Sequence, residues 1–384
     1  MTMTTTAART RRIPRLAIVA WSVAAVILAV LAVAVWRYLS HGSGSMTGMG
    51  HDAAHALTRA GADPTGPLLG SALIRSWHLD ALALAAVVLA AAAYLTGVAL
   101  VPVRQDGARW PLVRTVSFLA GLAVVVFATN GSIAVYDQVL FTAHMAGHLA
   151  LVMLAPALLV AGQPLRLTVT AAGERTRTRV ERVAQGRVVS LLTAPPVALA
   201  SYCVVIVGSH LTGLMDSIMR NTWAGQVEHL IYIVVGCQFF VLVIGDEPIR
   251  WRLSTPARWV LLAVAMAVDT FTGIVLLQGA RAITMLPAPG VTVDPLSDTR
   301  TGGAIMWFGG DAIMALVMVV LVIGWLRRAE TDAERPAEQG WLEQARRANF
   351  AEHAGAGLSE EALMDDDDAA RESYNAWLTK LDRG

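Results

Sequence analysis

Four histidines lie at or near the ends of separate apolar stretches of this chain, and a fifth lies one helical turn from one of them. They are His78, His144, His148, His210 and His229. Hydrocarbon cannot solvate a polar side chain, so an ionisable residue in an apolar stretch is a candidate functional residue. Neutral imidazole is also the commonest metal ligand among protein side chains. If the apolar stretches bring these histidines together, the sequence predicts a metal site.

The spacing of the histidines supports a shared site. His144 and His148 stand four residues apart, so on a helix they share one face and lie about 6 Å apart along its axis. His210 and His229 flank a single connection, which predicts that they are neighbours. The alternative for each is a hydrogen bond between helices. For His78, which follows Trp77, the alternative is an anchor at the membrane surface.

Thioethers accompany these imidazoles. The methionines that fall near them in the predicted topology are Met145, Met215, Met219 and Met306. We take Met306 as a candidate ligand, with packing in the core as its alternative. The two cysteines form no CxxC motif, which argues against a thiolate site. Imidazole with thioether favours copper, in particular Cu(I), over calcium or magnesium.

A second cluster of soft ligands precedes the apolar body in the segment HGSGSMTGMGHDAAH. Its candidate ligands are Met46, Met49, His51 and His55. Glycines between them would let the segment wrap a Cu(I) ion, which prefers soft ligands. The alternative is a flexible Gly/Ser linker that contains methionines by chance.

Apolar runs long enough to cross a bilayer dominate the chain. Of 384 residues, 55% are hydrophobic and 15% charged, and the mean hydropathy is +0.54. About 20 apolar residues span a membrane, and spans in lipid must be helices or closed barrels. The sequence predicts an all-α polytopic membrane protein with about eight spans, near 16–36, 78–101, 112–129, 141–162, 189–208, 229–245, 259–279 and 303–326. Pro156 and Pro195-Pro196 predict kinks.

Arginines alternate between the connections of these spans. Sixteen lie before the first span and in the second-to-third, fourth-to-fifth and sixth-to-seventh connections, against six in the other short connections. Because arginine is retained on the cytoplasmic side, both termini are expected there. The five histidines then all face the extracytoplasmic side.

Four segments follow from this pattern. We expect a basic leader and anchor helix over 1–36, an extracytoplasmic Met/His linker over 37–76, a seven-helix body over 77–326 and a cytoplasmic polar tail over 327–384. In the tail, Tyr374, Trp377, Leu378 and Leu381 have the spacing of an amphipathic helix. Asp269 and Asp311 lie inside spans, where a carboxylate is expected to be partnered or protonated.

Several of these motifs resemble one known family. The segment FTAHMAGHLALVMLAPALLV resembles the H-M-x-x-H signature of the CtaG-type cytochrome c oxidase assembly factors. GSHLTGLMD with QVEHLIY, IGDEPIRWRLSTPAR and TGGAIMWFGGD are similar to further stretches of that family, in the same order over residues 77–326. Two features depart from it. SDTRTGG has no glutamine where the family shows Asp-Gln, and the anchor helix and linker extend beyond the usual body.

This resemblance implies a non-enzymatic role in the maturation of haem-copper oxidase, with copper supplied on the outer side of a bacterial plasma membrane. His144 and His148 would match the paired histidines of the family, and His210 and His229 those around the fifth-to-sixth connection. The implied partners are oxidase subunits, other copper chaperones and the lipid bilayer, and not nucleic acid. A haem-binding electron-transfer subunit, a metal permease and a metal-free assembly scaffold are the alternatives.

Overall fold

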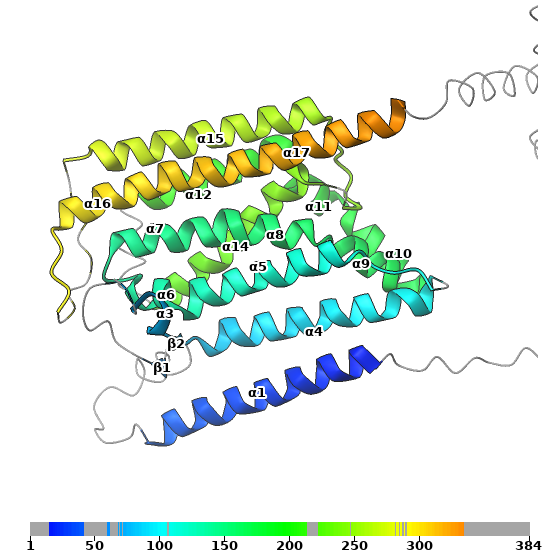
Figure 1. Ribbon diagram of the computed structural model, residues 1–384, viewed down its shortest axis with the longest axis horizontal. Helices are drawn as coiled ribbons and strands as arrows, with labels where there is room; N and C mark the ends of the chain where they lie inside the picture. Colours follow the sequence, from blue (N-terminus) through cyan, green and yellow to red (C-terminus); the bar gives the residue numbers. More distant parts are fainter. Residues whose placement is uncertain are drawn as a thin grey trace, which may run out of the picture. The chain divides into compact units, whose positions relative to one another are not determined.

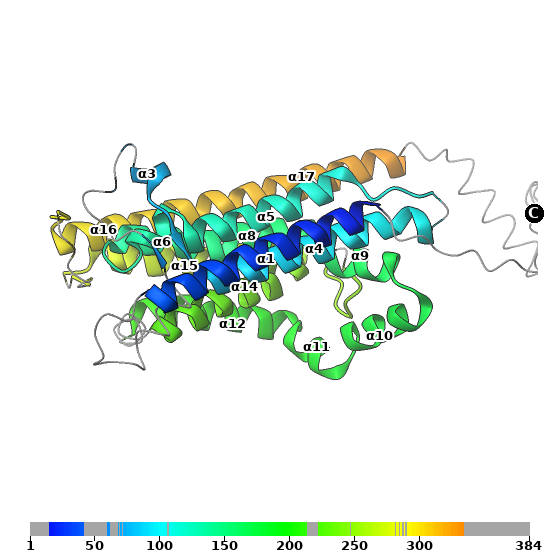
Figure 2. The same ribbon diagram turned by 90° about the horizontal axis from the view of Figure 1, so that it is seen from below.

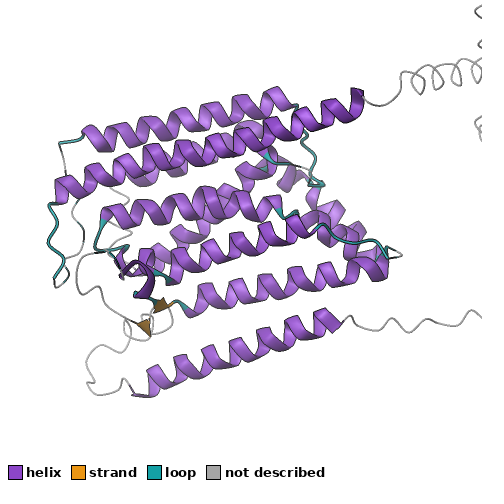
Figure 3. Cartoon of the chain, in the orientation of Figure 1, coloured by secondary structure: helices purple, strands orange, loops and turns teal. Residues whose placement is uncertain are grey.

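The computed structural model describes residues 15–41, 60–61, 68, 70, 72–105, 107–212, 222–245, 247–280, 282–283, 285, 288 and 290–333. Almost every described element is a helix (Figures 1 and 3). The first elements are α1 (Arg15–His41), β1 (Ala60–Gly61), α3 (Ala72–Arg75), β2 (His78–Leu79), α4 (Ala81–Arg104), α5 (Leu112–Asn130) and α6 (Ser132–Tyr136). The middle elements are α7 (Phe141–Leu149), the π-helix η1 (Ala150–Leu154), α8 (Ala155–Ala161), α9 (Pro164–Ala171), α10 (Glu174–Ala184), α11 (Arg187–Leu192) and α12 (Pro195–Leu211). The last elements are α14 (Thr222–Val243), α15 (Thr255–Gln278), α16 (Pro295–Ala304), the π-helix η2 (Ile305–Gly309) and α17 (Gly310–Ala333).

The apolar helices confirm the predicted class of fold. Among the described residues, seven helical segments are long and apolar enough to cross a membrane, and α12 is a shorter apolar helix at 17 residues. Together they match the eight predicted runs of sequence, so the chain is an all-α polytopic membrane protein. The cytoplasmic placement of both termini stays a prediction.

Two compact units divide the chain, Met1–Val319 and Val320–Gly384, and the boundary falls within α17. All the histidines discussed below belong to the first unit. In the second unit the structure describes only the end of α17, so the tail with Tyr374, Trp377, Leu378 and Leu381 lies outside the described residues.

The span that carries His144 and His148 is the central one of the first unit. This span consists of α7, η1 and α8, and it packs against α5, α14, α16 and η2. Two thirds of the residues in its most apolar stretch are buried. The corresponding share is 17% for α1, which packs along α4 (Figure 1). Most residues of the central span are therefore shielded by protein, whereas α1 exposes most of its apolar surface as an anchor helix in lipid would.

The fifth predicted span differs from the structure at its start. We expected one kinked helix from Val189, but α11 ends at Leu192 and α12 begins at Pro195. The predicted kink at Pro195-Pro196 is wrong, because proline is well accommodated in the first helical turn, where its missing N–H has no helical partner. In the central span, Pro156 lies in the first turn of α8, which follows η1 directly.

A short ribbon joins the linker to the first helix of the bundle. β1 and β2 pair antiparallel, with Gly61 opposite His78 and Ala60 opposite Leu79. Asp80 then caps α4 by accepting a hydrogen bond from the Ala83 amide, and its other oxygen accepts one from Gln226 Nε2. These bonds fix the start of α4 beside the start of α14.

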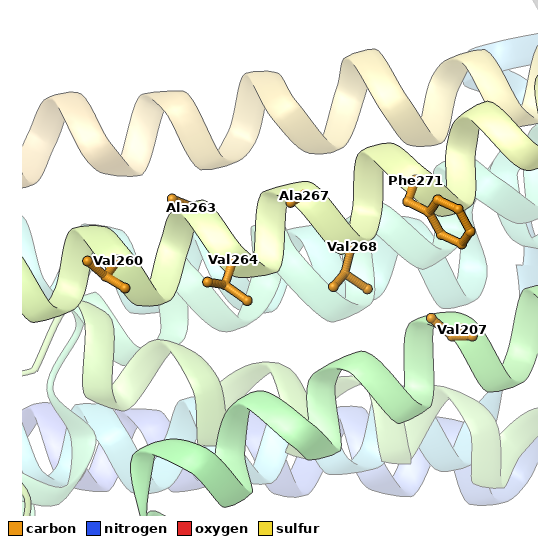
Figure 4. Close-up of a pocket in the computed structure, with 7 residues that line it drawn as sticks. All are labelled: Val207, Val260, Ala263, Val264, Ala267, Val268 and Phe271. Carbon is orange, nitrogen blue, oxygen red and sulfur yellow. The ribbon is translucent and has the colours of Figure 1, made fainter.

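An apolar groove runs along α15 and reaches α12. Its volume is about 490 Å³, and Val207 of α12 faces Val260, Val264, Val268 and Phe271 of α15 across it (Figure 4). All its lining residues are apolar, as a surface in contact with lipid acyl chains requires.

Candidate metal centre

Two histidines of α7 contact each other inside the bundle. The ring centroids of His144 and His148 are 4.0 Å apart, and the two residues are 1% and 4% exposed. The Nε2 atom of each ring is buried and lacks a hydrogen-bond partner among the described residues. A buried polar atom without a partner costs free energy, so an unpaired nitrogen on each of two adjacent rings points to a missing ligand.

Asp137 orients the first of these rings. It lies at the end of α6, and its Oδ1 is 2.8 Å from His144 Nδ1. An ionised carboxylate can only accept, so in the neutral ring Nδ1 carries the proton and Nε2 keeps its lone pair. A carboxylate behind a histidine is the arrangement that holds metal-binding histidines in proteins, because it fixes both the tautomer and the orientation of the ring.

A chain of hydrogen bonds fixes the tautomer of the second ring. His210 Nδ1 lies 2.7 Å from the Ile206 carbonyl oxygen, which can only accept, so this nitrogen carries the proton. His210 Nε2 is then the acceptor for His148 Nδ1, which lies 2.8 Å away. With its proton on Nδ1, neutral His148 presents a lone pair at Nε2. Both unpaired Nε2 atoms of α7 are therefore set up as electron-pair donors.

Glu228 of α14 completes the group. Its Oε1 lies 3.6 Å from His148 Nε2 and accepts a hydrogen bond of 2.7 Å from the Tyr232 hydroxyl. One ligand atom each from His144, His148 and Glu228 lie within 4.8 Å of one another. Glu228 is 6% exposed, so its carboxyl group is buried too. Two carboxyl groups beside neutral imidazoles make a cation the complementary occupant.

The backbone around the centre holds α7 in place. Asp298 of α16 caps α7, because its carboxylate accepts hydrogen bonds from the Phe141 amide at 2.6 Å and the Thr142 amide at 3.1 Å. Two π-helical turns lie close by, η1 directly after Leu149 and η2, which packs against α7. Such turns are rare and occur frequently at functional sites.

A glycine brings α14 close to the central span. A Cβ atom on Gly236 would lie 2.3 Å from the Val152 carbonyl oxygen, so only glycine allows this approach. Glu228, Tyr232 and Gly236 are spaced four residues apart and therefore share one face of α14. The close contact at Gly236 directs that whole face, with its carboxylate, toward the central span.

The predicted site residues occupy different places. His144, His148 and His210 come together, with ring centroids of His148 and His210 4.8 Å apart. Among the described residues, the group of ligand atoms contains Glu228 and not its neighbour His229, which interacts electrostatically with His148. His78 is buried in β2 outside this group. Met306 is buried in η2. The metal roles of His78, His210, His229 and Met306 stay predictions.

Other predictions fall outside the described residues or beside the centre. Met46, Met49, His51 and His55 of the linker lie outside the described residues, as do Met215 and Met219.

The two carboxylates inside spans differ in their hydrogen bonding. Asp311 accepts a hydrogen bond from the Thr270 hydroxyl at 3.0 Å. Asp269 is fully buried, and neither of its oxygens has a hydrogen-bond partner among the described residues, so the expected partner is not seen there.

Three residues of the centre were missed by sequence reasoning, namely Asp137, Glu228 and Tyr232. Glu228 was adjacent to a residue that was chosen, and Tyr232 follows it by one helical turn. A carboxylate at the start of an apolar run was the available signal. Asp137 carried no signal, because it lies in the turn before α7 and not on the helix itself.

We expect replacement of Asp137 by asparagine to weaken metal binding by about 10- to 100-fold, the usual cost of losing the carboxylate behind a metal-binding histidine. The amide keeps the size of the side chain but removes the charge that holds the proton on His144 Nδ1. Titration of the purified protein with metal in competition with a chelator measures the effect. Asp294→Asn is the matched control, because Asp294 caps α16 and asparagine caps as well as aspartate. Equal affinities of the two variants would contradict the role of Asp137.

The fold and this centre define a class, a polytopic membrane protein with a buried histidine–carboxylate group in its central span. Comparison with known families refines that class. The model of the family described as "Cytochrome c oxidase caa3 assembly factor (Caa3_CtaG)" matches residues 92–328. The match covers more than half of the chain, which therefore belongs to the Caa3_CtaG family. That description makes the family one of assembly factors and not of enzymes.

Relatives among curated proteins are uncharacterized. The uncharacterized protein Mb0105 of Mycobacterium bovis is 29% identical over 318 residues, which is 80% of this chain and 44% of that protein. The uncharacterized protein ML1998 of Mycobacterium leprae is 30% identical over 274 residues, or 67% of this chain and 41% of that protein. This chain thus spans less than half the length of these relatives. No solved structure matches it significantly.

Proposed function

We propose that this protein binds copper at His144, His148 and Glu228 and supplies it during assembly of a cytochrome c oxidase. The observation that carries the proposal is the pair of buried Nε2 atoms on adjacent rings, each with a lone pair and no hydrogen-bond partner among the described residues. Packing alone gives no reason for such a pair, because an apolar side chain would fill the same space without the cost of an unpaired nitrogen.

The donor set supports a transition metal as the cargo. Imidazole nitrogen suits copper and zinc, whereas calcium and magnesium prefer oxygen ligands. Two histidines with one glutamate also occur in zinc sites. Membership in a family of assembly factors for a copper-containing oxidase favours copper. We assign the two Nε2 atoms as the main ligands of copper, a pair that Cu(I) would use. The Glu228 carboxylate is the third ligand.

The hydrogen bonds around the centre suit reversible binding. Because Nδ1 of both His144 and His148 already holds the proton, neither ring has to lose one when Nε2 binds a cation. The Tyr232 hydroxyl stays bonded to Glu228 and limits how strongly that carboxylate donates. The ligands include no thiolate, which would hold copper more firmly. A carrier requires this kind of exchangeable site.

The sidedness and the source of copper form part of the proposal. We place the centre on the extracytoplasmic side, which the positive-inside distribution of the arginines supports. The linker residues Met46, Met49, His51 and His55 would capture Cu(I) on that side and pass it to the buried centre, after loading by another copper chaperone. The receiving partner is a subunit of the oxidase.

Binding of haem is the alternative that the geometry disfavours. Bis-histidine ligation needs two rings separated by the plane of the porphyrin. Here the ring centroids are 4.0 Å apart for His144 and His148 and 4.8 Å apart for His148 and His210, so the rings are in contact and leave no space between them for a macrocycle.

A strain that lacks this protein tests the proposal. We expect its membranes to contain an oxidase with less copper and lower activity, and we expect wild-type protein to restore both. A His144→Ala/His148→Ala variant that inserts in the membrane at the normal level is expected to restore neither. Full restoration by this variant would indicate a metal-free scaffold. Normal copper occupancy in the deletion strain would refute a role in copper supply.

A further inference from the structure

The end of the bundle opposite the histidines carries a concentration of arginines. In the central span α7 contains the histidines, and α8 leads away from them to α9, α10 and α11 (Figures 1 and 2). The connection between α14 and α15 also lies at this end. It contacts α11 there, because Trp251 Nε1 donates a hydrogen bond of 2.6 Å to the Ser190 carbonyl oxygen. The exposed arginines of α10, α11 and this connection are Arg175, Arg177, Arg179, Arg182, Arg187, Arg250 and Arg252.

Apolar side chains are exposed among these arginines. Val183 and Val188 are 65% and 71% exposed, and Leu191 and Leu192 are 65% and 51% exposed. The segment directly precedes α12, an apolar helix that begins at Pro195. Exposed valine and leucine beside arginine, at the point where an apolar helix starts, is the pattern of a helix that lies in the surface of a membrane.

The acidic residues nearby are few, and two of them already have partners. α10 contains Glu174 and Glu181, and Glu181 pairs with Arg177 at 3.0 Å. Glu247 accepts hydrogen bonds through both oxygens, from the Leu165 amide at 3.2 Å and the Arg166 amide at 2.7 Å, and so caps α9. Burial also raises the pKa of Glu247 to about 7. These carboxyl groups therefore offset little of the positive charge.

A cavity opens among the arginines and is large enough for a phosphate group. Its volume is about 340 Å³, and its lining includes Arg166, Arg252, Arg258, Trp251 and Glu247. Arg258 is fixed in the wall by hydrogen bonds to the carbonyl oxygens of Gly245 and Leu253. Arg166 and Arg252 are exposed, so their guanidinium groups are accessible to a ligand. Guanidinium binds phosphate through paired hydrogen bonds and charge.

We propose that this end of the protein binds an anionic phospholipid, with its phosphate headgroup in the cavity between Arg166, Arg252 and Arg258. The exposed side chains of Val183, Val188, Leu191 and Leu192 then rest in the adjacent acyl region. A lipid fits better than free phosphate, because only a lipid accounts for the apolar side chains as well as the arginines. The inference is independent of metal binding at the other end.

Native mass spectrometry of the full-length protein tests this inference. We expect phosphatidylglycerol to bind more tightly than phosphatidylcholine and to be lost as salt rises, because salt screens exposed charges. Each arginine near an anionic lipid contributes a factor of about five, equivalent to about 1 kcal/mol. An Arg166→Gln/Arg252→Gln variant is therefore expected to bind phosphatidylglycerol on the order of 25-fold more weakly, with little change for phosphatidylcholine.

The matched control is Arg109→Gln/Arg300→Gln, which removes the same charge from two exposed positions that do not line the cavity. Equal binding of the two lipids by the wild-type protein, or an equal loss in the control variant, would overturn the proposal. Full displacement of the lipid by inorganic phosphate would instead identify a site for free phosphate. The salt series uses only the wild-type protein, so it decides the question even if a variant fails to fold.

Discussion

Replacing both His144 and His148 by alanine is expected to remove the copper bound at the buried centre of the purified protein. The change deletes two of three proposed ligands and leaves Glu228, whose single carboxylate cannot hold the ion. The expected loss of affinity exceeds the roughly 10- to 100-fold cost of removing one outer-shell partner. Metal analysis after copper loading and dialysis, with the wild-type protein beside it, measures the effect.

His229→Ala is the informative control for this variant. His229 follows Glu228 directly, so its side chain points about 100° away around the axis of α14. Because Glu228 faces the centre, we expect the His229→Ala protein to keep most of its copper and the Glu228→Gln protein to lose part of it. The opposite order would show that α14 presents His229 to the metal. Wild-type copper content in the double histidine variant would rule out the centre altogether.

Replacing Gly236 by alanine is expected to disrupt the centre from a distance. The added methyl group would meet the Val152 carbonyl oxygen at 2.3 Å and Pro156 Cγ at 2.6 Å, and neither atom belongs to a flexible side chain. Such overpacking costs about 1–3 kcal/mol. Because Glu228 and Tyr232 share a face with Gly236, we also expect weaker copper binding. Thermal unfolding and copper titration measure the two effects.

Gly225→Ala provides the comparison within the same helix. A Cβ atom on Gly225 would have no other atom within 4 Å, and alanine has the higher helix propensity. We therefore expect this variant to match or exceed the wild-type thermal stability and to bind copper normally. Similar losses in both variants would mean that any change in α14 is harmful and that the close contact at Gly236 has no special role.

Most of the fold was predictable because membrane spans have a simple physical signature. A run of about 20 apolar residues must be helical in lipid, whatever its neighbours are. The fifth span was the exception, since α11 and α12 are both apolar and the prolines between them were interpreted as a kink. The linker that contains Met46 and His51 stays a prediction.

The candidate site was predictable only in part, because its geometry depends on which face of each helix points inward. The spacing of His144 and His148 placed both on one face without further information. For α14, the choice between Glu228 and His229 required the contact at Gly236, which the sequence does not reveal. The tautomer of His148 required two more facts, the distances from His210 to Ile206 and to His148 itself.

X-ray absorption at the copper edge of the copper-loaded protein tests the central claim most directly. We expect nearest neighbours of nitrogen and oxygen, together with the outer scattering of two imidazole rings, and we expect that scattering to disappear in the His144→Ala/His148→Ala variant. Nearest neighbours dominated by sulfur, or a spectrum without imidazole scattering, would contradict a copper centre on α7.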